Sequence, residues 1–466
     1  MKNYPIATYD NWTNRSRLGR WITGHLLDFG RESGKSHVVF DWRLSQIREC
    51  GAHVIRIFHK PILLVYSPEL VRFFLNLDPQ SWIKLPMTTR IFPAIMQKSL
   101  ICKSGSDWKS HQRHFTPFFH LAKLQKFTDH FVKSAEKLTE LWRKRGEGGK
   151  SFLIDADIHS LTIKSIMQSL LGMDLEFSND QNDSKGIIHS FMVLCRNVEI
   201  PKSIRQWIPK LPLLWRFTER GNDVQFAMDK MNRLVAGVSA ASHKRKDVSD
   251  LAYYITTKTT MTAKELTADI FAFIFAGHET SKNTLIWCLY ELASSAELQD
   301  EIFEEYQAMM KKNKDLSSFI NRDTLLTSFI SEVQRFYSVA PELAPRILTK
   351  DTMMPNGTVA PAGTCFNIGI WESHMNPYTW HEPHIFKPKR FQEEEIPTCA
   401  FLPFSMGVRK CIGYKYAILQ LRAVLIVLVR SFRFKLDPDH NVIKTRIMTI
   451  SPHNGVKMTI EPRDDL

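Results

Sequence analysis

The chain has 466 residues, of which 44% are apolar and 11% aromatic, and can therefore bury a large core. Its 62 basic and 48 acidic residues give a formal charge of +14, which favours contact with an acidic protein, an anionic lipid surface or nucleic acid. The basic residues are dispersed and form no nucleic-acid-binding motif, so we expect no nucleic-acid partner. Seven cysteines without a CxxC pair are unlike a disulfide framework or a zinc site.

The sequence predicts one large, mainly helical domain. We expect it to span residues 18–466, after an extension, residues 1–17, without a transmembrane anchor. No apolar run approaches the length of about 20 residues that a membrane-spanning helix needs. In chain order, the patterns predict a β-hairpin at 53–66, a helix beginning at Ser67 and Pro68, mainly helical structure at 107–345, small strands at 346–370 and a helix at 416–429.

The clearest predicted helix begins at Thr262. Thr262 and Glu265 have the spacing of a capping box, and apolar residues follow at helical spacing to a predicted end near Ser295. Such a helix would be about 50 Å long at about 1.5 Å per residue, and would cross the whole molecule.

The middle of this helix carries the sequence AGHETS, residues 276–281. Gly277 leaves room for a ligand beside the backbone, while Glu279 and Thr280 add an acid and a hydroxyl, which suits a small ligand that must be protonated. Alternatively, Gly277 is a helix packing contact, Glu279 is exposed, and Thr280 donates a hydrogen bond to a backbone carbonyl. The residues alone leave both interpretations open.

Glu332 and Arg335 lie three residues apart in SEVQRF and would face the same side of a helix. Arg390, in FKPKRF, can join them in a network of three charged residues. Such pairs are common and usually solvated. A buried triad would instead tie the helix to the loop that carries Cys411.

Cys411 lies in FLPFSMGVRKCIGYK between Gly407 and Gly413. A structural thiol, a catalytic nucleophile and a metal ligand are the alternatives. A structural thiol would need neither glycine, and no motif supplies a base for a nucleophile. Gly407 allows a tight turn whose backbone N–H groups point at sulfur, and the helix that follows favours a thiolate at its N-terminus. A thiolate shielded by Phe404 favours heme ligation.

These motifs together resemble the cytochrome P-450 superfamily of heme-thiolate monooxygenases, over about residues 18–460. The sequence around Cys411 and the TPFFH stretch are most similar to animal fatty-acid and sterol hydroxylases. The resemblance implies the cytochrome P-450 fold, which is mainly α with small β-sheets and has a long central helix over the heme. It also implies heme b, bound non-covalently, with Cys411 as the axial ligand of the iron. The matching positions are Phe404, Gly407, Arg409, Cys411 and Gly413 in the heme-binding signature, Glu332 with Arg335, Pro388 with Arg390 and Phe391, and Ala276, Gly277, Glu279, Thr280 and Ser281.

The resemblance also implies how the heme propionates are held. The chain departs from the family pattern at Gln112, where arginine is common; Lys109 or His111 would then substitute. Ala276 stands where some members carry a glutamate bonded covalently to heme, so no such bond is expected. The propionate partners that the resemblance implies are Trp108, Arg346 and Arg409.

The implied reaction is hydroxylation or epoxidation of a lipophilic substrate with one atom of O2, and Glu279 and Thr280 would deliver the protons. No flavin or nicotinamide module fits in this length, so electrons from NADPH must arrive through a partner. Tyr414 and Lys415 replace the paired arginines of mitochondrial members, which favours a flavoprotein reductase over a ferredoxin. The basic face expected to meet this partner consists of Lys109, Lys410, Lys415 and Arg422.

Two other functions are alternatives, a heme-thiolate isomerase or dehydratase and a heme-binding sensor without turnover. Retention of both Glu279 and Thr280 favours the monooxygenase. An apolar substrate pocket is expected around residues 91–96, Phe273 and 340–344. Residues 200–217 would either contact a membrane interface or pack on the protein's own core, and the cytoplasmic face of the endoplasmic reticulum is the expected location.

Overall fold

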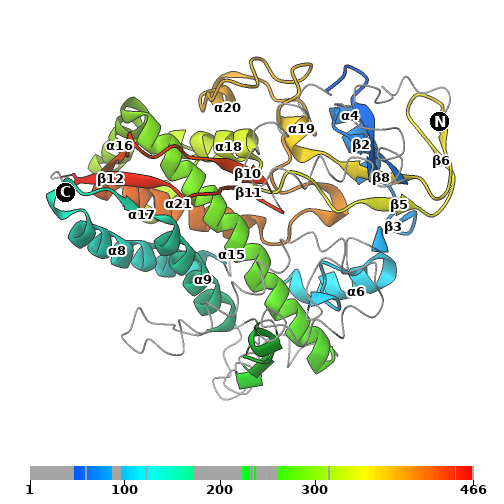
Figure 1. The fold of residues 1–466 in the computed structure, drawn as a ribbon, viewed down its shortest axis with the longest axis horizontal. Helices are drawn as coiled ribbons and strands as arrows, with labels where there is room; N and C mark the ends of the chain where they lie inside the picture. Colours follow the sequence, from blue (N-terminus) through cyan, green and yellow to red (C-terminus); the bar gives the residue numbers. More distant parts are fainter. Residues whose placement is uncertain are drawn as a thin grey trace.

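A computed structural model of the chain describes residues 47–463, except 58–59, 87–95, 121–123, 173–222, most of 224–260, 313–314 and 447. The predicted extension at 1–17, the predicted interface segment at 200–217 and most of the predicted pocket segment at 91–96 lie outside the described residues. The described part is mainly helical, with the largest sheet at one end and smaller sheets elsewhere in the molecule (Figure 1).

The helix α15 (Ala263–Ser294) runs diagonally through the middle of the molecule, as predicted (Figure 1). Its capping box is present, because the Glu265 backbone N–H donates to Thr262 Oγ1 over 3.3 Å and the Thr262 N–H donates to Glu265 Oε2 over 3.1 Å. The helix ends one residue before the expected Ser295, which caps the next helix.

Further helices pack around α15 and bury its apolar residues in one large core. The helix predicted at 416–429 is α21 (Tyr414–Ser431), which is buried throughout residues 423–429 because it lies between α8, α15, α16 and α18. The helices that complete this body are α8 (Thr128–Arg145), α9 (Asp155–Leu171), α16 (Ala296–Lys311), α17 (Leu316–Ile320) and α18 (Leu325–Tyr337), with the 3₁₀ turns η2 (Gln125–Phe127) and η3 (Glu147–Gly149).

A five-stranded sheet forms the other end of the molecule, in the order β1-β2-β8-β5-β3. The predicted hairpin is confirmed, because β1 (Ala52–Ile57) pairs antiparallel with β2 (Lys60–Val65). Strand β8 (Cys365–Ile368) joins β2 in parallel, and β5 (Arg346–Leu348) pairs antiparallel with both β8 and β3 (Trp82–Lys84). This register places Lys84 directly opposite Arg346, a pair far apart in the sequence.

The shorter elements connect this sheet to the helices. The predicted helix at Ser67 is α4 (Pro68–Leu75), whose Leu70 N–H donates to Ser67 Oγ over 3.4 Å. Among the described residues, no helix is long and apolar enough to span a bilayer. The remaining elements are α6 (Gly105–Phe115), α19 (Ile370–His374), α20 (Arg390–Glu393), the turn η4 (Gly407–Arg409), the hairpins β6 (Thr352–Met353) with β7 (Val359–Ala360) and β10 (Lys444–Arg446) with β11 (Ile450–Pro452), and the sheet of β4 (Phe152–Leu153), β12 (Lys457–Pro462) and β9 (Phe432–Leu436).

Candidate functional site: a cysteine loop, a central helix and a cationic cluster

Cys411 lies in a tight loop between η4 and α21. The loop turns at Gly407, whose φ of +68° favours glycine, and a Cβ there would lie 2.9 Å from the carbonyl oxygen of Leu75. The Cys411 N–H donates to the Phe404 carbonyl over 2.9 Å and closes the loop. Gly413 is the N-cap of α21. The tight turn predicted at Gly407 and the helix start predicted after Cys411 are therefore confirmed.

The thiol of Cys411 faces solvent within a crowded surface. The residue is exposed, yet burial raises the pKa of its thiol, although the Gly413 N–H and the charge of Lys410 act in the opposite direction. Both facts fit a sulfur that water can touch and that many protein atoms surround. This N–H belongs to the start of α21, where the sequence predicts a helix end that favours a thiolate, and it does not outweigh burial. A bound metal ion would take the sulfur as a thiolate.

One stripe of the central helix is accessible to solvent between buried neighbours. Phe273, Ala276, Gly277 and Thr280 are all half-buried, while the residues on either side of them are mostly buried. Their spacing of three and four residues places them on one face of α15. These residues therefore form the accessible side of α15 in the middle of the helix.

At Gly277 the predicted room for a ligand is occupied by protein. A Cβ on Gly277 would lie 2.2 Å from Ile166 Cδ1 of α9, so this glycine permits close packing of the two helices. This contact supports the alternative that Gly277 is a helix packing contact. It arises because the helix pair α9 and α15 brings together residues that are distant in the sequence.

Thr280 donates its hydroxyl hydrogen to the carbonyl of Ala276 over 2.7 Å. This is the back-bond that the alternative interpretation of the motif expected. Because its hydrogen is engaged, the hydroxyl oxygen presents lone pairs to the accessible face of α15. Thr280 can therefore accept a hydrogen bond from a protonated ligand without a change of rotamer.

Glu279 is 9% exposed, so the alternative that it lies in solvent is wrong. Its carboxylate accepts hydrogen bonds from Lys282 Nζ over 2.9 Å, Asn283 Nδ2 over 2.9 Å and Thr449 Oγ1 over 3.3 Å. Burial raises the pKa of Glu279, but Lys282 and Asn283 outweigh burial and place the pKa below its usual value. Glu279 is thus an anion with fixed partners, one residue along the helix from Thr280.

Two arginines and two tryptophans form a stack beside the cysteine loop. The guanidinium carbon of Arg409 lies 3.7 Å from the ring centroid of Trp108 and 5.1 Å from that of Trp82, and that of Arg346 lies 4.0 Å from the Trp82 ring. The Nη atoms of Arg409 donate to the Lys103 carbonyl over 3.2 Å. The predicted propionate partners Trp108, Arg346 and Arg409 are therefore brought together.

The charges of this stack have no counter-ion among the described residues. Neither Arg346 nor Arg409 contacts a described carboxylate, and Arg409 Nε is buried without a hydrogen-bond partner. Burial lowers the pKa of Arg346 to about 10, and burial with the neighbouring Arg346 lowers that of Arg409 to about 9. A buried and a half-buried cation without a described counter-ion fit the carboxylates of a heme group.

The residues expected to replace the missing arginine at Gln112 lie elsewhere. The ring of His111 is buried, with Nε2 3.1 Å from Asp269 Oδ2 on α15, so it is committed to that contact. Lys109 is exposed and makes no contact with the stack. Lys109 is therefore not supported as a substitute for the arginine missing at Gln112. The same prediction is wrong for His111, because His111 lies on the face of α6 that meets α15.

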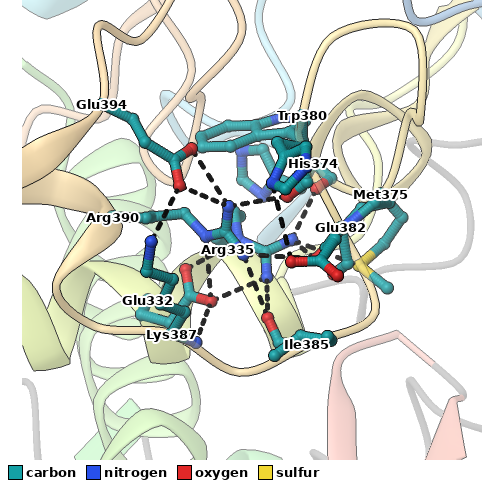
Figure 2. Close-up of polar contacts among 12 residues, drawn as sticks. Glu332, Arg335, His374, Met375, Trp380, Glu382, Ile385, Lys387, Arg390 and Glu394 are labelled. Carbon is teal, nitrogen blue, oxygen red and sulfur yellow. Dashed lines mark hydrogen bonds and ion pairs between the residues drawn. The ribbon is translucent and has the colours of Figure 1, made fainter.

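Glu332, Arg335 and Arg390 form the predicted buried triad (Figure 2). Arg335 Nε and Nη2 donate to the two carboxylate oxygens of Glu332 over 2.7 and 2.8 Å, and Arg390 Nε donates to Glu332 over 3.3 Å. Arg390 Nη1 also donates to the Glu394 carboxylate over 3.2 Å. Other guanidinium hydrogens are directed at the backbone carbonyls of His374, Pro383, His381, Glu382 and Ile385. The triad therefore holds residues 374–390 to α18.

His374 extends this network to the cysteine loop and was missed by the sequence analysis. The Leu402 backbone N–H donates to His374 Nε2 over 2.7 Å, so Nε2 is unprotonated and Nδ1 carries the hydrogen directed at Ser338 Oγ, 2.7 Å away. Burial, with the charge of Arg335, lowers the pKa of His374 to about 3 and keeps the ring neutral. The segment that leads to Cys411 is thus fixed by a second contact.

The predicted basic face is only partly available to a partner. Lys410 is exposed, with its Nζ 3.7 Å from the Tyr414 ring centroid, and Lys415 is half-buried. Arg422 instead donates to the Ile320 carbonyl over 3.1 Å and to Asp323 over 3.3 Å. Arg422 is therefore committed to α17 and its flank, which the sequence pattern did not indicate.

The cysteine loop, the accessible face of the long helix and the paired cationic stack define a heme-thiolate protein. The family model described as Cytochrome P450 matches residues 16–459. The chain belongs to the cytochrome P450 family. It is accordingly a heme-thiolate monooxygenase that binds heme b and uses O2, a substrate and a redox partner.

Known proteins similar to this chain match it over most of their own length. Human cytochrome P450 4F8 is 26% identical over 432 residues, which cover 86% of this chain and 81% of that protein. Human cytochrome P450 4B1 is 24% identical, covering 95% and 88%. Among solved structures, retinoic acid-bound cyanobacterial CYP120A1 has a TM-score of 0.78 at 18% identity, covering 95% of this chain and 97% of that one.

Proposed function

We propose that Cys411 is the axial ligand of the heme iron and that the accessible face of α15 borders the reaction site. The observation that carries this proposal is the combination of an exposed cysteine in a glycine-shaped loop with a stack of two arginines, beside it, that has no described counter-ion. Bound heme supplies the activation of O2 and the oxidation of a C–H bond. Trp108, Arg346 and Arg409 bind the propionates.

The remaining site residues position the ligand and protons. Phe404 shields the sulfur, and Gly407 shapes the loop whose N–H groups surround it. Ala276 contributes its small side chain to the accessible face, and its carbonyl orients the Thr280 hydroxyl. Thr280 accepts a hydrogen bond from the ligand, and Glu279, held as an anion by Lys282, supports proton delivery.

Thr280→Ala should uncouple electron consumption from product formation. Without the hydroxyl the accessible face loses its lone pairs, so a several-fold larger share of NADPH oxidation should yield hydrogen peroxide while heme content stays normal. The measurement compares peroxide, product and NADPH consumed in the reconstituted system, with Thr284→Ala as the matched control, because Thr284 makes the same type of back-bond one turn later. Wild-type coupling in Thr280→Ala would remove Thr280 from proton delivery.

The substrate is proposed to be a lipophilic compound such as a fatty acid or sterol. Phe273 of α15 contacts the rings of Phe115 and Phe119, with centroid separations of 4.8 and 5.5 Å, which gives the accessible face an apolar border. Met96 is buried, and within 340–344 Ala340 and Leu343 are half-buried whereas Glu342 and Ala344 are exposed. The resemblance of the sequence around Cys411 and of the TPFFH stretch to animal fatty-acid and sterol hydroxylases supports such a substrate.

The electron donor is proposed to be a flavoprotein reductase. It would meet the basic residues Lys410 and Lys415, and Lys109 is a further basic residue of the predicted face. Val408, the middle residue of η4, is 48% exposed and offers an apolar contact beside these charges. The proposed location is the cytoplasmic face of the endoplasmic reticulum. Residues 18–466 are proposed to form a single domain.

Reconstitution tests the proposed reaction. Purified holoprotein, a flavoprotein reductase and NADPH are incubated with fatty acids and sterols under isotopically labelled dioxygen. The expected product carries one labelled oxygen atom and forms only when reductase and NADPH are present. A substrate that is isomerised or dehydrated without NADPH would favour the alternative enzyme, and heme binding without any turnover across the panel would favour a sensor.

A further inference from the structure

Lys84 of β3 lies beside the cationic stack and is not used by the sequence motifs. It is two residues from Trp82 on the same strand, so both side chains lie on one face of the sheet, and it pairs directly with Arg346 of β5. Its N–H donates to Ser104 Oγ over 3.3 Å, and its Nζ donates to the Ile101 carbonyl. The same segment supplies the Lys103 carbonyl that binds Arg409. Lys84, Arg346 and Arg409 therefore converge from three separate parts of the chain.

The ammonium group of Lys84 has no described counter-ion. No described carboxylate contacts Lys84, and residues 87–95, which follow it closely in the chain, contain neither Asp nor Glu. Three cations gathered without an acid repel one another and are costly to bury. A ligand with two carboxylates would remove most of this cost.

We propose that Lys84 is a propionate partner of the heme and takes the role of the arginine that this chain lacks at Gln112. This inference rests on the proposed propionate site formed by Trp108, Arg346 and Arg409. Lys84 would be the third cation of that site, and it lies on strand β3 instead of helix α6. It also makes heme retention depend on a group that can lose its proton.

The electrostatic surroundings predict how this dependence varies with pH. Burial, with Arg409 and Arg346, lowers the pKa of Lys84 to about 7 in the protein without an anion, and the thiol of Cys102, whose own pKa burial raises, stays neutral beside it. A bound carboxylate raises the pKa of Lys84. The contribution of Lys84 to heme retention is therefore complete below about pH 7 and declines as the pH rises above it.

Heme transfer from the holoprotein to excess apomyoglobin measures this contribution. Lys84→Met should release heme about tenfold faster below neutral pH, as expected for loss of a hydrogen bond between charged groups. The difference from wild type should shrink at higher pH. Lys84→Arg should keep slow release at every pH, because arginine stays charged. Gln112→Arg in the Lys84→Met protein should restore slow release, since residue 112 lies one helical turn after Trp108.

The ferric/ferrous midpoint potential separates an electrostatic role from a structural one. Lys84→Met removes a positive charge near the heme edge and should lower the potential, whereas Lys84→Arg should leave it unchanged. Lys109→Met removes the same charge from an exposed position outside the stack and is the matched control. Wild-type release and potential in Lys84→Met would overturn the inference, as would equal effects of Lys84→Met and Lys109→Met.

Arg346→Met distinguishes failure of the inference from failure of the proposed site. Fast release from Arg346→Met with wild-type release from Lys84→Met would reject Lys84 alone. Wild-type release from both would place the propionates elsewhere. Should Lys84→Met yield no holoprotein, Lys84→Arg decides the matter: heme release that no longer varies around neutral pH supports the role of Lys84, and wild-type pH dependence overturns it.

Discussion

Cys411→Ser should abolish the long-wavelength Soret band of the reduced carbon monoxide complex and reduce product formation to background. The serine hydroxyl has a far weaker tendency than the thiol to ionise and donate electron density to iron, so the chemistry that depends on a thiolate is lost. The loop itself should keep its conformation, because the features that shape it do not use the sulfur atom. These features are the two glycines, Gly407 and Gly413, and the hydrogen bond from the Cys411 backbone N–H to the Phe404 carbonyl. Heme content and the reduced carbon monoxide spectrum are the measurements.

Cys50→Ser is the matched control for this substitution. Its sulfur is half-buried and lies 3.2 Å from the Ala52 carbonyl, a contact that a hydroxyl can reproduce. The control should therefore keep the wild-type spectrum and activity. A long-wavelength band that persists in Cys411→Ser, or that disappears in Cys50→Ser alone, would remove Cys411 as the ligand.

Arg335→Ala should prevent accumulation of holoprotein. The substitution leaves Glu332, which is 0% exposed, as a buried carboxylate without its bidentate partner, and a broken buried pair costs about 3–5 kcal/mol. It also frees the carbonyls of residues 374 and 383, which position the segment leading to the cysteine loop. Heme content per protein and the urea midpoint of unfolding measure the effect.

A double substitution tests whether the unpaired charge is the cause. Glu332→Leu with Arg335→Met removes both charges, so it should destabilise the protein less than Arg335→Ala alone. Arg433→Ala removes an arginine from an exposed pair with Asp300 and should cost at most about 1 kcal/mol. An Arg335→Ala protein with wild-type heme content and stability would contradict the structural role of the triad.

Local patterns made the elements around the site predictable. Capping at Ser67 and Thr262, the hairpin before Ser67 and the apolar run of α21 each depend on residues close together in the sequence. The tight turn at Gly407 was also predictable from the glycine before Cys411. The sequence indicated the network of Glu332, Arg335 and Arg390 but left its burial open, because exposed pairs of this spacing are common.

Contacts across the chain were not predictable in the same way. Gly277 meets Ile166 only because α9 packs on α15, and Glu279 binds Thr449 only because β11 begins beside that helix. The role proposed for Lys84 depends on the register of β3 with β5, which a three-residue strand does not reveal. The alternation of tryptophan and lysine in SWIKL was the available signal, and it is too short to assign a partner.

X-ray absorption at the iron edge of the purified holoprotein tests the central claim most directly. The account predicts one sulfur atom in the first coordination shell of the iron, absent from the Cys411→Ser protein and present in Cys50→Ser. A first shell of nitrogen and oxygen atoms only in the wild-type protein would contradict ligation by Cys411.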